Sequence, residues 1–362
     1  MLDTLPPDRL TWRERIAALG KPGIRPDRVP VYPRVGGFAT FACGWSVADC
    51  YRDAHRSFAA QLRVRDLFGH DSGPGYGYAS MGGWELGGDI RWPEGEFAQA
   101  PEVSRYPVRS EDDLDRLAVP ADVLRAGAVP IMAEFSRLED RHFSAAALQL
   151  GGPVSRALTV APPEMVLRWM LKRPALAHHL FRVITDFLLE LAAAWARLFP
   201  GRGLSVFEDA PGEANALISP RMFREFSLPY LHEIHERAFA LGFDSFSTHI
   251  CGDHTANLES WAELDFARPG KVGAVSFGLE VPIDRAIEVL GHKAILIGNV
   301  DPARLLLGTP EEVFELGRVA LEQGKESPLG FILAPGCELP VRTPPENLRA
   351  LVAAARVHGR YD

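Results

Sequence analysis

Short apolar runs alternate along most of this chain with longer segments in which apolar residues recur every three or four positions. The first pattern is typical of buried strands, and the second is typical of amphipathic helices. In the second half the alternation is regular, and apolar runs at 203–209, 243–250, 272–277, 294–299 and 330–335 are each followed by a helical pattern. Strands that alternate with helices predict a parallel sheet with right-handed crossovers.

The first half of the chain supplies three further candidate strands, at 29–35, within 69–92 and at 143–150. The resulting count of eight predicts an α/β fold of the (β/α)8 TIM-barrel type. We expect residues 1–362 to form a single domain, with 1–28 as an N-terminal extension. An open doubly wound sheet is the alternative, but no strand is followed by the glycine-rich phosphate-binding motif G-x-G-x-x-G.

Helical patterns fill the segments between these strands. The charged segment 105–137 is helix-like and is expected to form a peripheral helical insertion. Ser219 is expected to cap one helix, with Pro220 at its first position. The other predicted helices cover residues 11–19, 47–68, 162–173, 174–199 and 219–241.

Composition and charge exclude several classes of protein. The chain has 47% hydrophobic residues and a formal net charge of −8, whereas proteins that bind nucleic acids or anionic membranes carry a basic surface. No basic flank precedes an apolar stretch at the N-terminus, and no segment resembles a membrane span. We therefore expect a cytoplasmic protein.

The strongest candidate for chemistry is the stretch from Phe243 to Asp253, which places a histidine and a cysteine two positions apart. Side chains alternate in a strand, so His249 and Cys251 point the same way. Cys337 follows a second apolar run in a Pro-Gly turn. Imidazole nitrogen and thiolate sulfur are ligands that zinc prefers, so these three residues predict a zinc site with one open position.

Such a ligand set favours one kind of reaction. With two thiolates the bound Zn²⁺ is formally neutral, and a thiol entering the fourth position can lose its proton there. A site of this kind suits alkyl transfer to sulfur better than hydrolysis. The alternative is a core histidine beside a buried cysteine, because H-x-C is a short motif.

Other polar residues are weaker candidates. Asp209 ends a predicted strand at the expected barrel mouth, where it could orient a substrate or support a ligand, or simply cap the following loop. Asn299 and Asp301 also end a strand, but GNVDP is mostly structural. Cys43 and Cys50 are expected to be small buried hydrophobes. The histidines on helices are expected at the surface or in packing, namely His178, His179, His232 and His235.

Four segments together resemble the uroporphyrinogen decarboxylase superfamily. They are FEDAPGEANALISPRMFREFSLPYLHEI, HICGD, ILIGNVDPARLLLGTPEEV and ILAPGCELPVRTPPENLRALVAAAR, and the similarity covers about residues 200–358. The chain looks most like the zinc-dependent branch of methylcobamide:coenzyme M methyltransferases and related alkyltransferases. The zinc signature of that branch is matched here by His249, Cys251 and Cys337.

The resemblance implies a barrel fold and a zinc thiolate, formed from a coenzyme M-like small-molecule thiol, that attacks a methyl-corrinoid on a separate protein. Two alternatives remain open, an epoxide-opening coenzyme M transferase and a uroporphyrinogen decarboxylase-like enzyme. Decarboxylases of this superfamily hold carboxylates with several arginines in an N-terminal segment, which here reads VPVYPRVGGFATF and contains one, Arg34. A non-catalytic ligand-binding protein is a third possibility.

Overall fold

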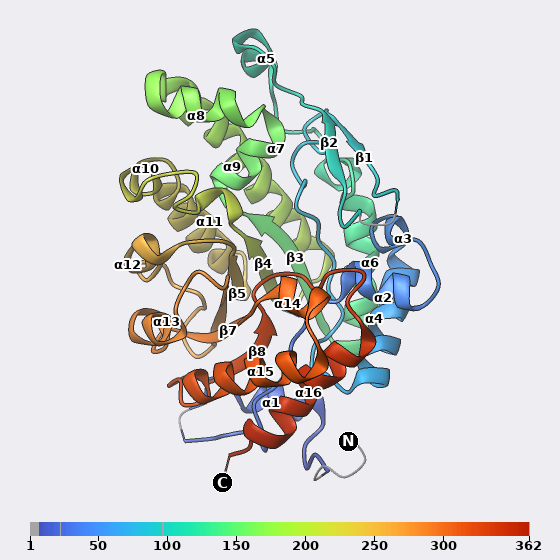
Figure 1. Ribbon diagram of the computed structural model, residues 1–362. Helices are drawn as coiled ribbons and strands as arrows, with labels where there is room; N and C mark the ends of the chain where they lie inside the picture. Colours follow the sequence, from blue (N-terminus) through green and yellow to red (C-terminus); the bar gives the residue numbers. More distant parts are fainter. Residues whose placement is uncertain (1–6, 22, 96–97, 362) are drawn as a thin grey trace.

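Six parallel strands form the central sheet of the computed structural model, which describes residues 7–21, 23–95 and 98–361 (Figure 1). Neighbouring strands in the sheet follow one another in the chain, as expected for an α/β barrel, with helices between them. The strands are β3 Ala145–Gly151, β4 Gly203–Asp209, β5 Phe243–Ile250, β6 Gly273–Phe277, β7 Ala294–Val300 and β8 Phe331–Pro335.

The two remaining strands of the predicted eight differ from expectation. Residues 29–35 contribute a single parallel bridge, between Val31 and Leu333 of β8, which continues the strand order past β8. The segment 69–92 contains no strand of this sheet, so that prediction was wrong. Its only strand, β1 Asp89–Arg91, pairs antiparallel with β2 Glu102–Arg105 outside the sheet (Figure 1).

Glycines and side-chain hydrogen bonds explain why the second strand is missing. Gly73, Gly75 and Gly77 weaken any strand in this segment. Tyr78 is instead held beside β3 by the side chain of Gln149, which accepts from its N–H at 2.9 Å and donates to its carbonyl at 3.1 Å. Side-chain hydrogen bonds therefore replace backbone pairing between strands at this position. Among the described residues, strand pairing does not close the barrel.

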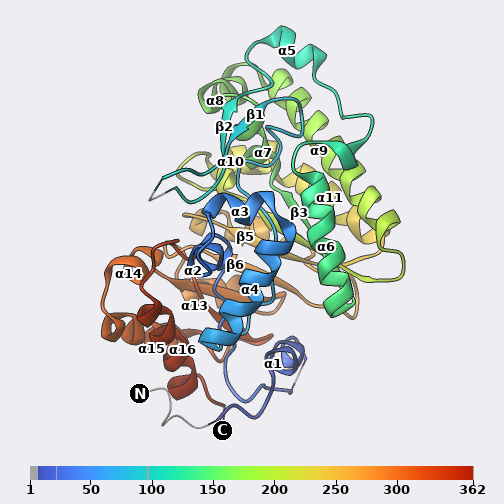
Figure 2. The same ribbon diagram turned by 90° about the vertical axis from the view of Figure 1, so that its right-hand side faces the viewer.

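Helices pack around the sheet. In Figure 2, α4 and α6 run side by side along the flank where the second strand is absent. The longer helices are α4 Ala54–Phe68, α6 Val129–Phe143, α8 Pro163–Lys172, α9 Pro174–Leu198, α11 Leu228–Ala240, α15 Pro310–Gly324 and α16 Pro345–His358. The shorter ones are α1 Trp12–Ala18, α2 Gly36–Ala42, α3 Val47–Arg52, α5 Glu111–Arg116, α7 Pro153–Val160, α10 Pro220–Phe226, α12 Leu258–Trp261, α13 Ile283–Leu290 and α14 Pro302–Leu307.

Two predicted helices are each split by a local signal. The helix expected at 219–241 begins as predicted, with the Ser219 side chain accepting from Met222 N–H, but breaks at Ser227 between α10 and α11. Pro229 explains the break because proline has no N–H and crowds the preceding turn. The segment 47–68 is divided into α3 and α4 by Asp53, whose carboxylate caps α4.

The peripheral insertion is only partly as predicted. Helix α5 lies far from the sheet, at the top of Figure 1. Helix α6 instead packs directly on β3, where Ser136 donates to the carbonyl of Ala147 at 2.7 Å and Glu139 accepts from the N–H of Ala147 at 3.0 Å. These side chains satisfy backbone groups at the edge of β3 that the missing strand would otherwise have paired. None of the described helices is long and apolar enough to cross a membrane.

The buried carboxyl group of Glu139 gives the fold a testable pH dependence. Burial raises the pKa of Glu139 to about 8, whereas the pKa of a glutamate carboxyl in an unfolded chain is about 4.3. Between these values only the folded state keeps the proton, so the contribution of Glu139 to stability falls as the pH rises. We expect Glu139→Gln to gain about 2 kcal/mol relative to wild type between pH 5.5 and 7.5, measured by urea unfolding. A constant difference between the two proteins would contradict this assignment.

Candidate metal centre

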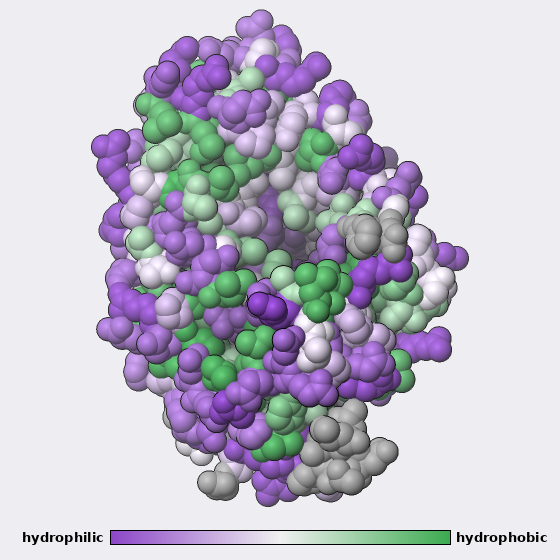
Figure 3. Space-filling view, in the orientation of Figure 1, coloured by the Kyte–Doolittle hydropathy of each residue, from purple (hydrophilic) through white to green (hydrophobic). Residues whose placement is uncertain are grey.

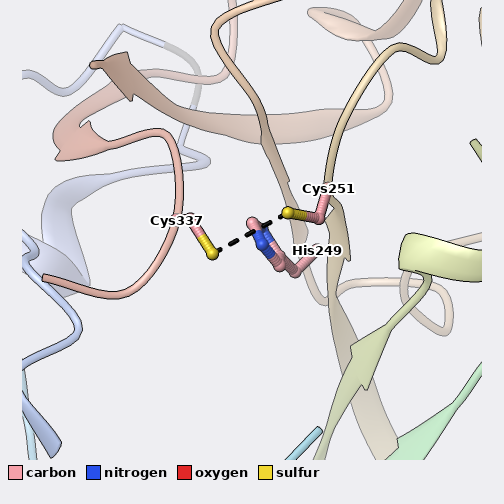
Figure 4. Close-up of side chains that lie close together, drawn as sticks. All are labelled: His249, Cys251 and Cys337. Carbon is pink, nitrogen blue, oxygen red and sulfur yellow. Dashed lines mark hydrogen bonds between the residues drawn. The ribbon is translucent and has the colours of Figure 1, made fainter. Parts of the chain in front are cut away.

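Three residues from two distant segments meet at the carboxyl ends of the strands. His249 lies in β5, Cys251 directly follows it, and Cys337 follows β8 (Figure 4). Their candidate ligand atoms all lie within 4.8 Å of one another, and the two sulfurs are 3.7 Å apart. The structure thus brings together the three residues that the sequence pattern singled out.

Local backbone structure explains this convergence. Ile250 is fully buried on the opposite face of β5 from His249, as strand alternation predicts. Gly252 turns the chain after Cys251 with φ of +88°, a conformation that glycine adopts without strain. On the other side, Gly336 N–H donates to the carbonyl of Val300, which fixes the turn that carries Cys337.

The imidazole of His249 is oriented for ligation. Its Nδ1 lies 2.5 Å from Oγ of Ser276, the residue paired with His249 on β6. Its Nε2 is buried and has no hydrogen-bond partner among the described residues. A buried polar atom without a partner is costly, so Nε2 is suited to bind a metal ion while Nδ1–H donates to Ser276.

The two cysteines also fit a metal ion. Two sulfurs bound at about 2.3 Å in a tetrahedral zinc site lie about 3.8 Å apart, close to the observed separation. The thiol of Cys251 donates a hydrogen bond to Cys337, and this bond together with the nearby His249 lowers the pKa of the Cys337 thiol. Since the thiolate is the form that binds metal, Cys337 is prepared for ligation.

A histidine that the sequence analysis did not single out braces the Cys251 loop. His254 is fully buried, and its Nδ1 accepts a hydrogen bond from the indole N–H of Trp261 at 3.1 Å. Its Nε2 therefore carries the proton and donates to the carbonyl of Cys251 at 3.2 Å. Burial lowers the pKa of His254 to about 4, so the ring is neutral at physiological pH.

Removing the hydroxyl of Ser276 is expected to weaken metal binding. Ser276→Ala deletes the partner of His249 Nδ1 and frees the ring to rotate. Residues that orient a metal ligand contribute about 10–100-fold to affinity, so zinc affinity should fall by about that factor. Competition with a chromophoric chelator measures it, and Ser276→Thr, which keeps the hydroxyl, should stay near wild type. Equal affinities for the alanine and wild-type proteins would show that Ser276 has no orienting role.

Asp209 ends β4 beside His249 in the sheet register, but it makes other contacts. It is 7% exposed, forms an ion pair with Arg156 and accepts from Gln149 Nε2 at 3.0 Å. It does not cap an exposed loop, and it is absent from the described residues that line the cavity next to His249 and Cys337. Its contacts favour a supporting role over direct contact with a substrate.

The remaining candidates have structural contacts. Asn299 donates to the carbonyls of Gly278 and Val281, and Asp301 caps α14, in keeping with the structural role expected of this segment. Cys50 is buried as predicted, and burial raises its pKa to about 12, whereas Cys43 is half-buried.

Two of the four histidines expected on helices, His178 and His235, make packing contacts. His235 is buried in packing, stacked on Phe246 and hydrogen-bonded to Glu208. His178 contacts Tyr230.

The fold and site define a class of protein, an α/β-barrel protein with a candidate His-Cys-Cys metal centre at the carboxyl ends of its strands. Residues 14–358 match the family described as uroporphyrinogen decarboxylase (URO-D). The chain belongs to this family, as the resemblance of its motifs implied.

Individual relatives include two kinds of enzyme. The chain is 31% identical over 263 residues to "Methylcobamide:CoM methyltransferase MtaA" of Methanosarcina barkeri, covering 70% of each protein. It is 29% identical over 267 residues to "Uroporphyrinogen decarboxylase" of Myxococcus xanthus, again covering 70% of each. A solved "methyltransferase from Methanosarcina mazei" superposes with a TM-score of 0.77 at 25% identity, covering 96% of this chain and 98% of the other.

Proposed function

We propose that this protein is a zinc-dependent methyltransferase that moves a methyl group from a methylated corrinoid to a small-molecule thiol. The observation that carries the proposal is the approach of His249, Cys251 and Cys337 to within 4.8 Å of one another. Relatives named as methylcobamide:CoM methyltransferases support the same transfer. A solved methyltransferase structure supports methyl transfer in general. Residues 1–362 would act as one domain, in the cytoplasm.

Each ligand residue has a defined task. His249 would bind the ion through Nε2, and Cys251 and Cys337 would bind it as thiolates. When bound there, Zn²⁺ supplies an open position at which a substrate thiol loses its proton and becomes nucleophilic. Ser276 and His254 hold the imidazole and the Cys251 loop in place. Asp209, tied to Arg156, supports the end of β4 beside His249.

The size of the cavity bears on the methyl donor. The cavity next to His249 and Cys337 measures about 300 Å³, at the lower end of pockets that hold drug-sized molecules. A corrinoid macrocycle exceeds this volume, so it would approach the cysteines from outside, carried on a separate protein. In the transfer, the cobalt–carbon bond breaks with its electron pair left on cobalt, and a sulfur–carbon bond forms.

The lining of the same cavity argues against decarboxylation of a tetrapyrrole. That reaction would need several cations to hold the carboxylates of the substrate. Among the described residues that line the cavity, Arg34 is the only arginine, and its guanidinium lies over the ring of Phe207 at 3.8 Å.

A pair of incubations tests the proposed reaction. The zinc-loaded protein is mixed with coenzyme M or 2-mercaptoethanol, and then with methylcobalamin or epoxypropane in separate reactions. We expect a methyl thioether with methylcobalamin and no product with epoxypropane, with products identified by mass spectrometry. A product with epoxypropane alone would replace methyl transfer by epoxide opening, and product formed equally without zinc would contradict the role of the metal.

A further inference from the structure

Small side chains line part of the interior of this barrel, beside larger ones such as Tyr32, Phe207 and Ile297. Barrel interiors are normally filled by layers of bulky branched residues. Here the positions that line the central cavity include Ala147, Ser205, Ser247, Ser276 and Ala334. Small residues cannot fill the centre, so a cavity of about 300 Å³ remains there, and a hollow is visible near the centre of the face in Figure 3.

Exposure along the strands supports a hollow interior. Ser205 is half-buried, whereas its neighbours Leu204 and Val206, which face the surrounding helices, are buried. Ser247 is likewise half-buried between two fully buried residues of β5. On β4 and β5 the inward-facing serines are thus more accessible than their neighbours, whereas Ile295, Ile297 and Ile332 of β7 and β8 are buried together in a hydrophobic cluster.

The cavity is elongated and connects with the metal centre. At one end it is lined by His249 and Cys337, and at the other by Glu139, Phe143 and Ala145. Ala145 is at the level of Gly203 in the sheet, and His249 is at the level of Asp209. Gly203 and Asp209 are six residues apart on β4, so the two ends of the cavity are separated by roughly 20 Å along the strand.

At the far end of the cavity, where Ala145 is exposed, the described lining residues include no Lys or Arg side chain. Arg34 is the single Lys or Arg side chain among the described lining residues, whereas two carboxyl side chains, Glu139 and Glu338, also line the cavity. Glu139 lies at this far end, and burial raises its pKa to about 8, so at neutral pH it is a hydrogen-bonding group without charge. The serine hydroxyls add further uncharged donors and acceptors.

We propose that the barrel interior binds the body of the thiol substrate, which is an elongated thiol with an uncharged far end bearing hydroxyl or amide groups. This inference rests on the proposed function, because it takes the sulfur to lie at the His249, Cys251 and Cys337 centre. A short thiol such as coenzyme M would leave most of the cavity unfilled.

Calorimetry with the zinc-loaded full-length protein tests this inference, using pantetheine as an elongated uncharged thiol and coenzyme M and 2-mercaptoethanol as short ones. We expect pantetheine to bind at least about tenfold more tightly than either short thiol. Ser247→Leu, which fills the middle of the cavity, should weaken pantetheine binding at least about tenfold and change 2-mercaptoethanol binding by less than about twofold. Ser104→Leu, on the exposed face of β2, is the matched control.

Zinc content, measured first, separates the two hypotheses. If the protein binds no zinc, the proposed function fails and this inference fails with it. If zinc binds but pantetheine and the short thiols have equal affinities, or if Ser247→Leu leaves pantetheine binding unchanged, the inference alone is overturned. Ser205→Val narrows the cavity at a second position and replaces Ser247→Leu if that variant does not fold.

Discussion

Cys251→Ser and Cys337→Ser are each expected to abolish methyl transfer from methylcobalamin to a thiol. A serine hydroxyl remains protonated at neutral pH and is a poor zinc ligand, so each variant would lose one of the three proposed protein ligands. Metal assistance contributes several kcal/mol to a reaction of this kind, so its loss should lower kcat/KM by about a thousandfold or more. Steady-state rates with added zinc measure this effect.

Cys43→Ser is the matched control for both variants. Cys43 is a free, half-buried cysteine outside the three-residue centre, so this variant should keep the wild-type rate and the wild-type zinc content. If Cys251→Ser or Cys337→Ser retained activity within about tenfold of wild type, the corresponding sulfur would not be a ligand that the reaction needs.

Asp209→Ala is expected to cause the largest loss of stability among the site variants. It leaves the guanidinium of Arg156 buried and unpaired, since Arg156 is 1% exposed. Removing one partner of a buried ion pair costs about 3–5 kcal/mol. Urea unfolding of the zinc-free protein should show a loss of this size. Asp209→Asn, which can still accept from Gln149, should lose less.

The same variant separates the two roles considered for Asp209. A supporting residue lowers stability and zinc affinity together, without a specific change in KM for the thiol. If Asp209→Ala were as stable as wild type and raised only KM, Asp209 would contact the substrate directly, and the network around Arg156 would have no structural role.

The three residues of the candidate centre could be predicted from sequence, but the residues that contact them could not. His249 and Cys251 form a local pattern because alternation in a strand sets their directions. The role of Ser276 can be recognised only when the strand register is known, because the register pairs Ser276 with His249. Arg156 and Asp209 are 53 positions apart in the sequence, so their contact has no local pattern. An isolated serine or arginine gives no sequence signal, because its role depends on how distant segments pack.

The fold shows a similar limit. The later strands were predicted because their apolar runs are buried on the sheet and bounded by turns. The segment 69–92 was wrongly assigned a strand of the barrel. Its place beside β3 depends on the side chain of Gln149, which bonds the backbone of Tyr78, a contact between distant residues that no local pattern reports.

Metal analysis of the purified protein tests the central claim most directly. We expect about one zinc ion per chain in the wild-type protein, and a large loss of bound zinc in both Cys251→Ser and Cys337→Ser. Cobalt substitution should add thiolate-to-cobalt absorption bands that weaken in each variant. A wild-type protein that binds no zinc after dialysis against the ion, or two serine variants that bind it as tightly as wild type, would contradict the claim.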